Sequence, residues 1–172
     1  ARSSFPWATR ERELISSRET EGDVESRKVV LEILEASLQS LDSCLLIRKL
    51  LQLEGSVLRI GNYRWDLKKR RRIFVVGAGK ACNAMARAVE DTLGDRISGG
   101  LVIVKRLEDS ESLQHIELTE GGHPIPNEKG YRATRRILKM VEEAEPGDLF
   151  LGLISGGSSA LMNCPVQGIA VE

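Results

Sequence analysis

Aromatic residues and net charge are both scarce in this chain of 172 residues. Phenylalanine, tryptophan and tyrosine make up 4% of it, which is too little to predict a surface that stacks nucleic-acid bases. The 25 lysines and arginines balance the 25 aspartates and glutamates, so no overall field attracts nucleic acid or a charged membrane. We therefore expect no nucleic-acid partner and no membrane partner.

Cysteines and long apolar runs are also few. Cys44, Cys82 and Cys164 are odd in number and far apart, which favours neither a disulfide framework nor a zinc knuckle, so a reducing cytoplasm is the expected location. No apolar run approaches the ~20 residues that span a bilayer, and the N-terminal residues lack the apolar centre of a signal peptide. The hydrophobic content of 41% is nevertheless enough for the core of one domain of ordinary size.

The chain changes in pattern at about residue 25. Residues 1–25 mix charged residues, serine and threonine without periodicity, and they are predicted to form a poorly ordered leader. Residues 26–172 are predicted to form one domain. It begins with a small helical pair, because apolar residues recur at helical spacing over 26–41 and leucines are frequent over 44–53.

A hairpin and a basic run follow the helical pair. Residues 56–60 and 63–67 are predicted to pair as strands, because Gly61-Asn62 between them is a typical two-residue hairpin turn. Residues 68–72 (KKRRR) indicate either a patch for nucleic acid or targeting, or a solvated turn before a buried strand. Since charged runs commonly flank buried strands, the turn is the favoured interpretation.

The remainder alternates between apolar strands and helices. Such alternation is typical of a doubly wound, Rossmann-like, mostly parallel sheet with helices on both faces, and this α/β fold is the one we predict. The predicted strands are 73–76, 99–104, 116–118 and 149–154, and the predicted helices are 79–93 and 128–143.

Two glycine turns follow strands of this predicted sheet. Gly77 and Gly79 come directly after one strand, and residues 155–159 (SGGSS) come directly after another. Turns from strand to helix expose backbone N–H groups, which bind anions. Lys80 falls in the first turn of the predicted helix, where the helix dipole disfavours a second positive charge unless an anion shares the site. The pattern therefore predicts a site for a phosphorylated or carboxylated small molecule.

Other motifs for this chemistry are incomplete. A Walker A sequence is absent, and Cys82 stands where a dinucleotide fingerprint has its third glycine. Residues 156–160 lack the final glycine of a nucleophile elbow, and His115 and His123 both precede these serines. Ser155, Ser158 and Ser159 are therefore candidates for holding phosphate, with helix capping as the structural alternative.

Three stretches together resemble the N-terminal domain of glycerate 2-kinases, the two-domain kinases whose second half is the MOFRL domain. They are residues 75–81 (VVGAGKA), 121–128 (GGHPIPNE) and 153–161 (LISGGSSAL). Their order and spacing match as well, and the resemblance runs from about Ser26 to the last residue. One difference is Ser158, which stands where the family usually has a third glycine.

The resemblance implies phosphorylation of D-glycerate by ATP, with Mg²⁺, to 2-phosphoglycerate in a cleft between two domains. It implies that Lys80 is the catalytic lysine and that the other matching residues hold substrate or phosphate; the metal ligands stay unknown. These binding residues are Gly77, Gly79, His123, Ser155, Gly156, Gly157, Ser158 and Ser159. Glycerate and ATP are thus the expected small-molecule partners, and association of the chain with itself is left open.

The resemblance also implies a second domain that this sequence does not contain. We expect that domain to supply further catalytic residues, so the chain alone should have little or no kinase activity. Two alternatives remain: an NAD(P)H-dependent hydroxypyruvate reductase, or a truncated domain that binds ligand without catalysis. The reductase is disfavoured because Lys105 and Arg106 end the strand where an acidic residue would bind the ribose.

Overall fold

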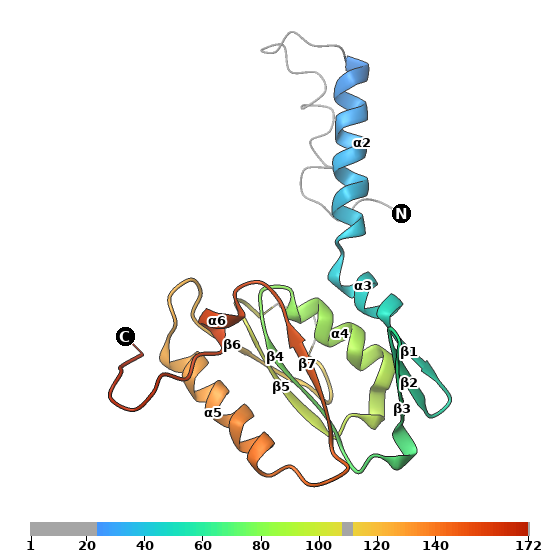
Figure 1. The fold of residues 1–172 in the computed structure, drawn as a ribbon. Helices are drawn as coiled ribbons and strands as arrows, with labels where there is room; N and C mark the ends of the chain where they lie inside the picture. Colours follow the sequence, from blue (N-terminus) through green and yellow to red (C-terminus); the bar gives the residue numbers. More distant parts are fainter. Residues whose placement is uncertain (1–23, 108–111, 172) are drawn as a thin grey trace. The chain divides into compact units, whose positions relative to one another are not determined.

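The computed structural model describes residues 24–107 and 112–171, which belong to two units, 1–42 and 43–172 (Figure 1). The first unit contributes helix α2 (Val24–Ser40), close to the predicted bounds of 26–41. The predicted leader lies outside the described residues except for its last two positions. Among the described helices, none is both long enough and apolar enough to cross a bilayer.

The second unit opens with helix α3 (Ser43–Leu50) and a three-stranded antiparallel sheet. The strands are β1 (Leu51–Glu54), β2 (Val57–Ile60) and β3 (Tyr63–Asp66), and Gly61-Asn62 joins β2 to β3 as predicted. The helix predicted over 44–53 is wrong at its end. Leu51 is buried and Gln52 is exposed, an alternation that fits a strand, and β1 pairs with β2.

The main sheet has four parallel strands in the order β6-β5-β4-β7. Strands β5 and β7 have the predicted bounds, whereas β4 extends two residues further and β6 starts one residue later and ends two residues later. The strands are β4 (Ile73–Ala78), β5 (Gly99–Val104), β6 (Glu117–Glu120) and β7 (Leu149–Ile154).

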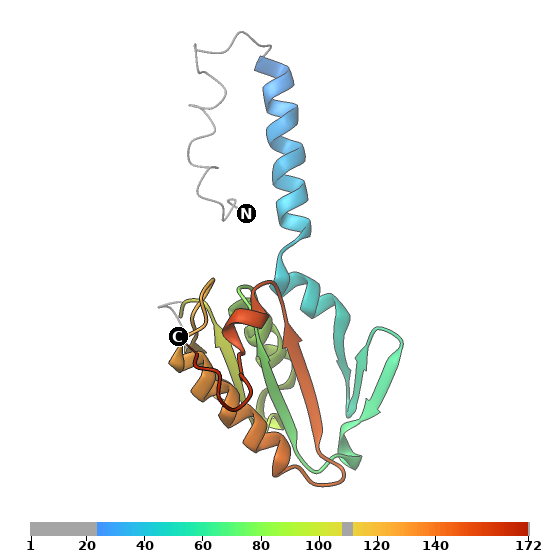
Figure 2. The ribbon, with the colours of Figure 1, turned by 60° about the vertical axis from the view of Figure 1, so that its left-hand side comes forward.

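Two helices cover the two faces of this sheet, as Figure 2 shows. Helix α4 (Cys82–Leu93) packs on the face that carries Val75 and Val102, where the buried leucines of the small sheet also lie. Helix α5 (Glu128–Glu142) packs on the opposite face with Leu101 and Ile103. Both faces are buried, which explains the almost continuously apolar strands and confirms the doubly wound α/β prediction.

The strand order creates a switch point beside β4. The chain passes from β4 to β5 and β6 on one side, and then returns through α5 to place β7 on the other side of β4. Loops that leave β4 and β7 at their carboxyl ends therefore diverge to opposite faces. In open α/β sheets this divergence is where ligands bind. The short helix α6 (Ser158–Leu161) follows β7 at this edge (Figure 1).

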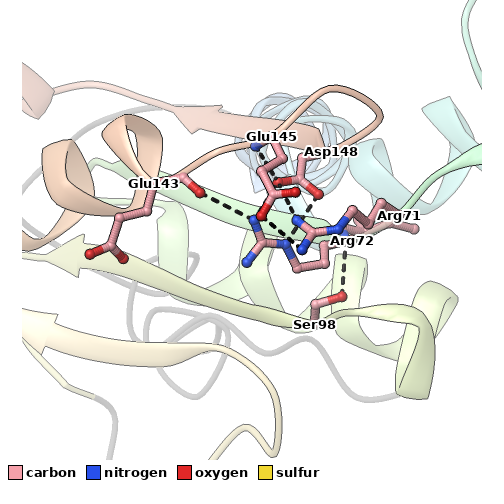
Figure 3. Close-up of polar contacts among 7 residues, drawn as sticks. Arg71, Arg72, Ser98, Glu143, Glu145 and Asp148 are labelled. Carbon is pink, nitrogen blue, oxygen red and sulfur yellow. Dashed lines mark hydrogen bonds and ion pairs between the residues drawn. The ribbon is translucent and has the colours of Figure 1, made fainter.

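The basic run lies at the opposite edge of the sheet, where β4 begins. It forms the 3₁₀ helix η2 (Leu67–Lys69) and a turn, as the favoured interpretation predicted. The turn is anchored: Arg72 donates to both carboxylate oxygens of Asp148, at 3.1 and 2.6 Å, and Arg71 lies 2.8 Å from Glu145 (Figure 3). These ion pairs hold the start of β4 against the segment that enters β7.

Asp148 makes the free energy of unfolding depend on pH under acidic conditions. Its side chain is 1% exposed and also accepts the Glu145 N–H at 2.8 Å. The Arg72 hydrogen bonds, followed by this backbone bond, lower the pKa of Asp148 to about 2, below the value of ~3.9 for an unfolded chain. The unfolded state therefore binds more protons between pH 4 and pH 2, and stability is lost as the pH falls through this window.

We expect the urea midpoint of the wild-type chain to fall as the pH is lowered from 4 to 2. In Asp148→Asn that fall should be smaller, because the neutral amide has no proton to gain. Asp95→Asn is the matched control, since the Asp95 carboxylate is fully exposed. If both variants keep the wild-type pH dependence, the pKa of Asp148 is not depressed.

Candidate functional site

Three loops meet at the carboxyl edge of the main sheet. They are residues 79–81 after β4, 121–127 after β6 and 155–157 after β7. Each contains one of the sequence motifs described above. Backbone hydrogen bonds tie the first loop to the third: Lys80 donates its N–H to the Gly156 carbonyl at 3.0 Å, and the Ser155 N–H donates to Ala78 at 3.2 Å.

The loop after β4 has committed its N–H groups to the protein. Besides the Lys80 bond, Gly79 donates to the Ile103 carbonyl at 3.0 Å, and Ala81 donates to Ser155 Oγ at 3.1 Å. Helix α4 starts only at Cys82, so the prediction that Lys80 lies in the first helical turn is wrong. Three successive N–H groups bond to neighbouring segments here, and the helix begins only at the residue after them. The loop thus offers a ligand the exposed Lys80 side chain.

Gly77 and Gly79 allow β4 and β7 to approach closely. A Cβ on Gly77 would overlap the Leu153 carbonyl oxygen, with the carbonyl carbon at 2.7 Å. A Cβ on Gly79 would overlap Ser155 Oγ and lie 2.8 Å from the Ser155 nitrogen. Glycine is therefore required at both positions for β4 and its loop to pack against β7 and Ser155.

The loop after β7 keeps two N–H groups available. Within the described residues, the N–H groups of Gly156 and Gly157 donate to no protein acceptor. Gly157 has φ +90°, a left-handed conformation that favours glycine. A Cβ there would lie 2.6 Å from His123 Cδ2 and 3.5 Å from Lys80 Cγ. The Lys80 and His123 side chains therefore flank the glycine backbone, and the fold brings these predicted residues together.

His123 is half-buried in the loop after β6, and a cis peptide bond joins it to Pro124. Its Nδ1 atom is buried and has no hydrogen-bond partner among the described residues. Asn127 shapes the loop, because its Oδ1 accepts N–H groups from Gly122 at 2.9 Å and Gly130 at 3.0 Å. The second bond caps α5.

The three predicted serines lie in different environments. Ser155 directs Oγ inward, to the Ala81 N–H and to within 3.5 Å of Cys82 Sγ. Ser158 and Ser159 begin α6, which is a single turn of four residues, and Ser159 is exposed. The hydroxyl of Ser155 therefore joins the two loops, whereas Ser159 lies toward solvent.

Cys82 is a positioning residue that the sequence reasoning did not identify. It is fully buried, with Sγ 3.6 Å from the Leu153 carbonyl oxygen, and burial raises the pKa of its thiol. The protonated thiol packs beneath Ser155 and supports both loops. Its place in the incomplete dinucleotide fingerprint was the available signal, because that position packs a helix against a strand.

Metal ligands do not gather in this part of the chain. Across residues 24–107 and 112–171, no group of three or more histidine, cysteine, aspartate or glutamate side chains is placed to hold an ion. His115 lies 3.3 Å from Asp95 and comes just before the amino end of β6, whereas the glycine loops follow the carboxyl ends of their strands. Among the described residues, the groups that the site offers a ligand are thus one lysine, one histidine and backbone N–H donors.

Residues 29–172 match the family described as "Domain of unknown function (DUF4147)". The chain belongs to this family. The match covers all three loops and the whole main sheet. Several proteins similar to this DUF4147 domain are named glycerate kinases.

Two curated relatives and one solved structure illustrate the similarity. The D-glycerate 2-kinase of Thermotoga maritima is 37% identical over 101 residues, which cover 59% of this chain and 24% of the relative. A protein of Agrobacterium vitis with the provisional name of hydroxypyruvate reductase is 34% identical over 148 residues, covering 86% of this chain and 30% of that protein.

The crystal structure of a Thermotoga maritima glycerate kinase superposes on the DUF4147 domain with a TM-score of 0.65 and 29% sequence identity. The superposition covers 84% of this chain and 31% of that structure. This agreement confirms the predicted fold. The matched parts of this chain thus cover between 24% and 31% of the length of these three proteins.

Proposed function

We propose that this DUF4147 domain forms one half of the active site of a kinase that transfers a phosphoryl group from ATP to the 2-hydroxyl of D-glycerate. The observation that carries this proposal is the convergence of Lys80, His123 and the N–H groups of Gly156 and Gly157 at the switch point of the sheet. The relatives named as glycerate kinases support it.

The chemistry of phosphoryl transfer suits these groups. The reaction needs reactants in line and charge neutralised on the transferred oxygens, with little covalent participation by the protein. The Lys80 ammonium would neutralise part of that charge. The Gly156 and Gly157 N–H groups would donate to a phosphate or carboxylate oxygen from fixed directions, which avoids reorganisation during the reaction. His123, whose ring borders Gly157, would orient the ligand beside these donors.

ATP would suit this donor set, since its phosphate oxygens can accept from the free Gly156 and Gly157 N–H groups and pair with the exposed Lys80 ammonium. Mg²⁺ would neutralise phosphate charge when bound, but the described residues supply no cluster of ligands for it. We propose that phosphate oxygens and a second domain hold the metal. The same second domain would close the site against water, so the chain alone should show little or no turnover.

A hydroxypyruvate reductase is the second candidate, favoured by the provisional name of the Agrobacterium vitis relative. Such a reaction would need a nicotinamide cofactor, and the Gly77-Ala78-Gly79 turn follows a strand as a dinucleotide fingerprint requires. The buried Cys82 occupies the third glycine position, however, and Lys105 and Arg106 follow β5. The kinase therefore accounts for more of the site.

One assay separates the two functions. A full-length protein that carries this domain should consume ATP when D-glycerate is added, measured by coupling ADP formation to NADH oxidation. With hydroxypyruvate alone, without the coupling enzymes, NADH absorbance should stay constant. Turnover of NADH by hydroxypyruvate, with no ADP formed from glycerate, would reject the kinase in favour of the reductase.

A further inference from the structure

A cavity lies at the amino edge of the main sheet, at the opposite end from the glycine loops. Its volume is about 260 Å³, and it is built from the β1–β2 turn, η2, the start of β4 and the segment that enters β5. Five of its nine lining residues are cationic and none is acidic. They are Ser56, Leu67, Lys68, Arg70, Arg71, Arg72, Ile73, Arg96 and Ser98.

The positive charge of this cavity is only partly balanced. Arg71 and Arg72 pair with Glu145 and Asp148 (Figure 3). In the described part of the chain, no carboxylate is paired with the side chains of Lys68, Arg70 or Arg96. Three positive charges thus share one concave surface, and their mutual repulsion would be relieved by an anion.

Several contacts hold the wall of the cavity in place before any ligand arrives. The Arg72 guanidinium lies 5.0 Å from the centre of the Phe74 ring, in addition to its bond with Asp148. Arg96 donates to the Gly55 carbonyl at 3.3 Å. Ser98 Oγ accepts the Ile73 N–H at 3.1 Å, which leaves its hydroxyl hydrogen for another acceptor (Figure 3). A preorganised wall lowers the entropic cost of binding.

We propose that this cavity binds a small oxyanion of the phosphate class, carrying two or more negative charges, at a site separate from the glycine loops. The cavity is smaller than the ~300–1,000 Å³ of pockets for drug-sized ligands, which favours a phosphate or a short phosphate ester over a whole nucleotide. Guanidinium groups bind phosphate with two parallel hydrogen bonds, and arginines supply four of the five cations here. This inference does not rest on the kinase activity.

The test is a ¹⁵N–¹H NMR titration of the 172-residue chain at low ionic strength, because amide signals report the two sites separately. Inorganic pyrophosphate is the first probe. We expect the amides of residues 68–73 and 96–98 to shift together and to saturate. A parallel titration with glycerol 3-phosphate tests an organic phosphate ester. The probe that saturates these signals at the lower concentration is the better model of the ligand.

Arg70→Gln and Arg96→Gln should each raise the dissociation constant for these signals at least tenfold. Arg64→Gln, which replaces an exposed arginine on β3 outside the cavity, should leave it within twofold. If Arg96→Gln unfolds the chain, Arg70→Gln decides, because the exposed Arg70 side chain makes no bond in the described structure.

Three results would overturn the proposal. They are shifts confined to the amides of Gly156 and Gly157, shifts that never saturate, and a dissociation constant that Arg70→Gln leaves unchanged. A failure of the kinase assay leads to none of these results, so the two proposals fail independently.

Discussion

Gly77→Ala should strongly destabilise the folded chain. An added Cβ would overlap the Leu153 carbonyl oxygen and lie 2.9 Å from the Leu153 nitrogen, in the neighbouring strand β7. These are backbone atoms between two paired strands, so no side chain can turn aside to make room. We expect a loss of about 3 kcal/mol or more, out of a typical total of about 5–15 kcal/mol for a domain.

Gly152→Ala is the matched control for this prediction. Gly152 lies in β7, opposite Val76 in the register, and a Cβ there would meet no atom within 4 Å. Equilibrium unfolding in urea, followed by circular dichroism, should give a Gly152→Ala midpoint close to that of the wild type and a much lower midpoint, or no folded baseline, for Gly77→Ala. Equal midpoints for the two variants would mean that β4 and β7 do not approach as closely as described.

The main sheet was predictable because its strands are buried on both faces. Six consecutive apolar or glycine residues in β5, and again in β7, admit few other structures, and both strands have the predicted bounds. The error at β1 has a local cause. Leu50, Leu51 and Leu53 fit helical spacing as well as alternation, and only pairing with β2 decides between them.

The details of the site depended on contacts that are distant in sequence. The motifs predicted which loops contain Lys80, His123 and the glycines, and the fold brings these loops to one edge. They did not predict that Ser155 Oγ faces the Ala81 N–H, because 74 residues separate the two. The same limit applies to Arg72 and Asp148, whose pairing across 76 residues turns part of a basic run into a structural anchor.

Lys80→Ala, made in the full-length protein, should lower kcat for glycerate phosphorylation at least tenfold, which corresponds to about 1.4 kcal/mol of activation free energy. The side chain runs along the glycine loop: its Cε atom lies 3.7 Å from the position of a Cβ on Gly156. An ammonium group there can stabilise the negative charge on the oxygens of the transferred phosphoryl group, which an alanine side chain cannot do. Because Lys80 is exposed, the variant should keep the wild-type melting temperature.

Two further variants separate the role of the Lys80 side chain from charge in general. Lys49→Ala removes an exposed lysine from α3, far along the chain from the loops, and should leave kcat within twofold. Lys80→Arg keeps the charge but replaces a compact ammonium with a planar, bulkier guanidinium, so it should recover only part of the lost rate. Phosphate transfer by Lys80→Ala at the wild-type rate would remove Lys80 from the mechanism. A loss of rate as large in Lys49→Ala would mean that overall charge, and not the position of Lys80, controls turnover.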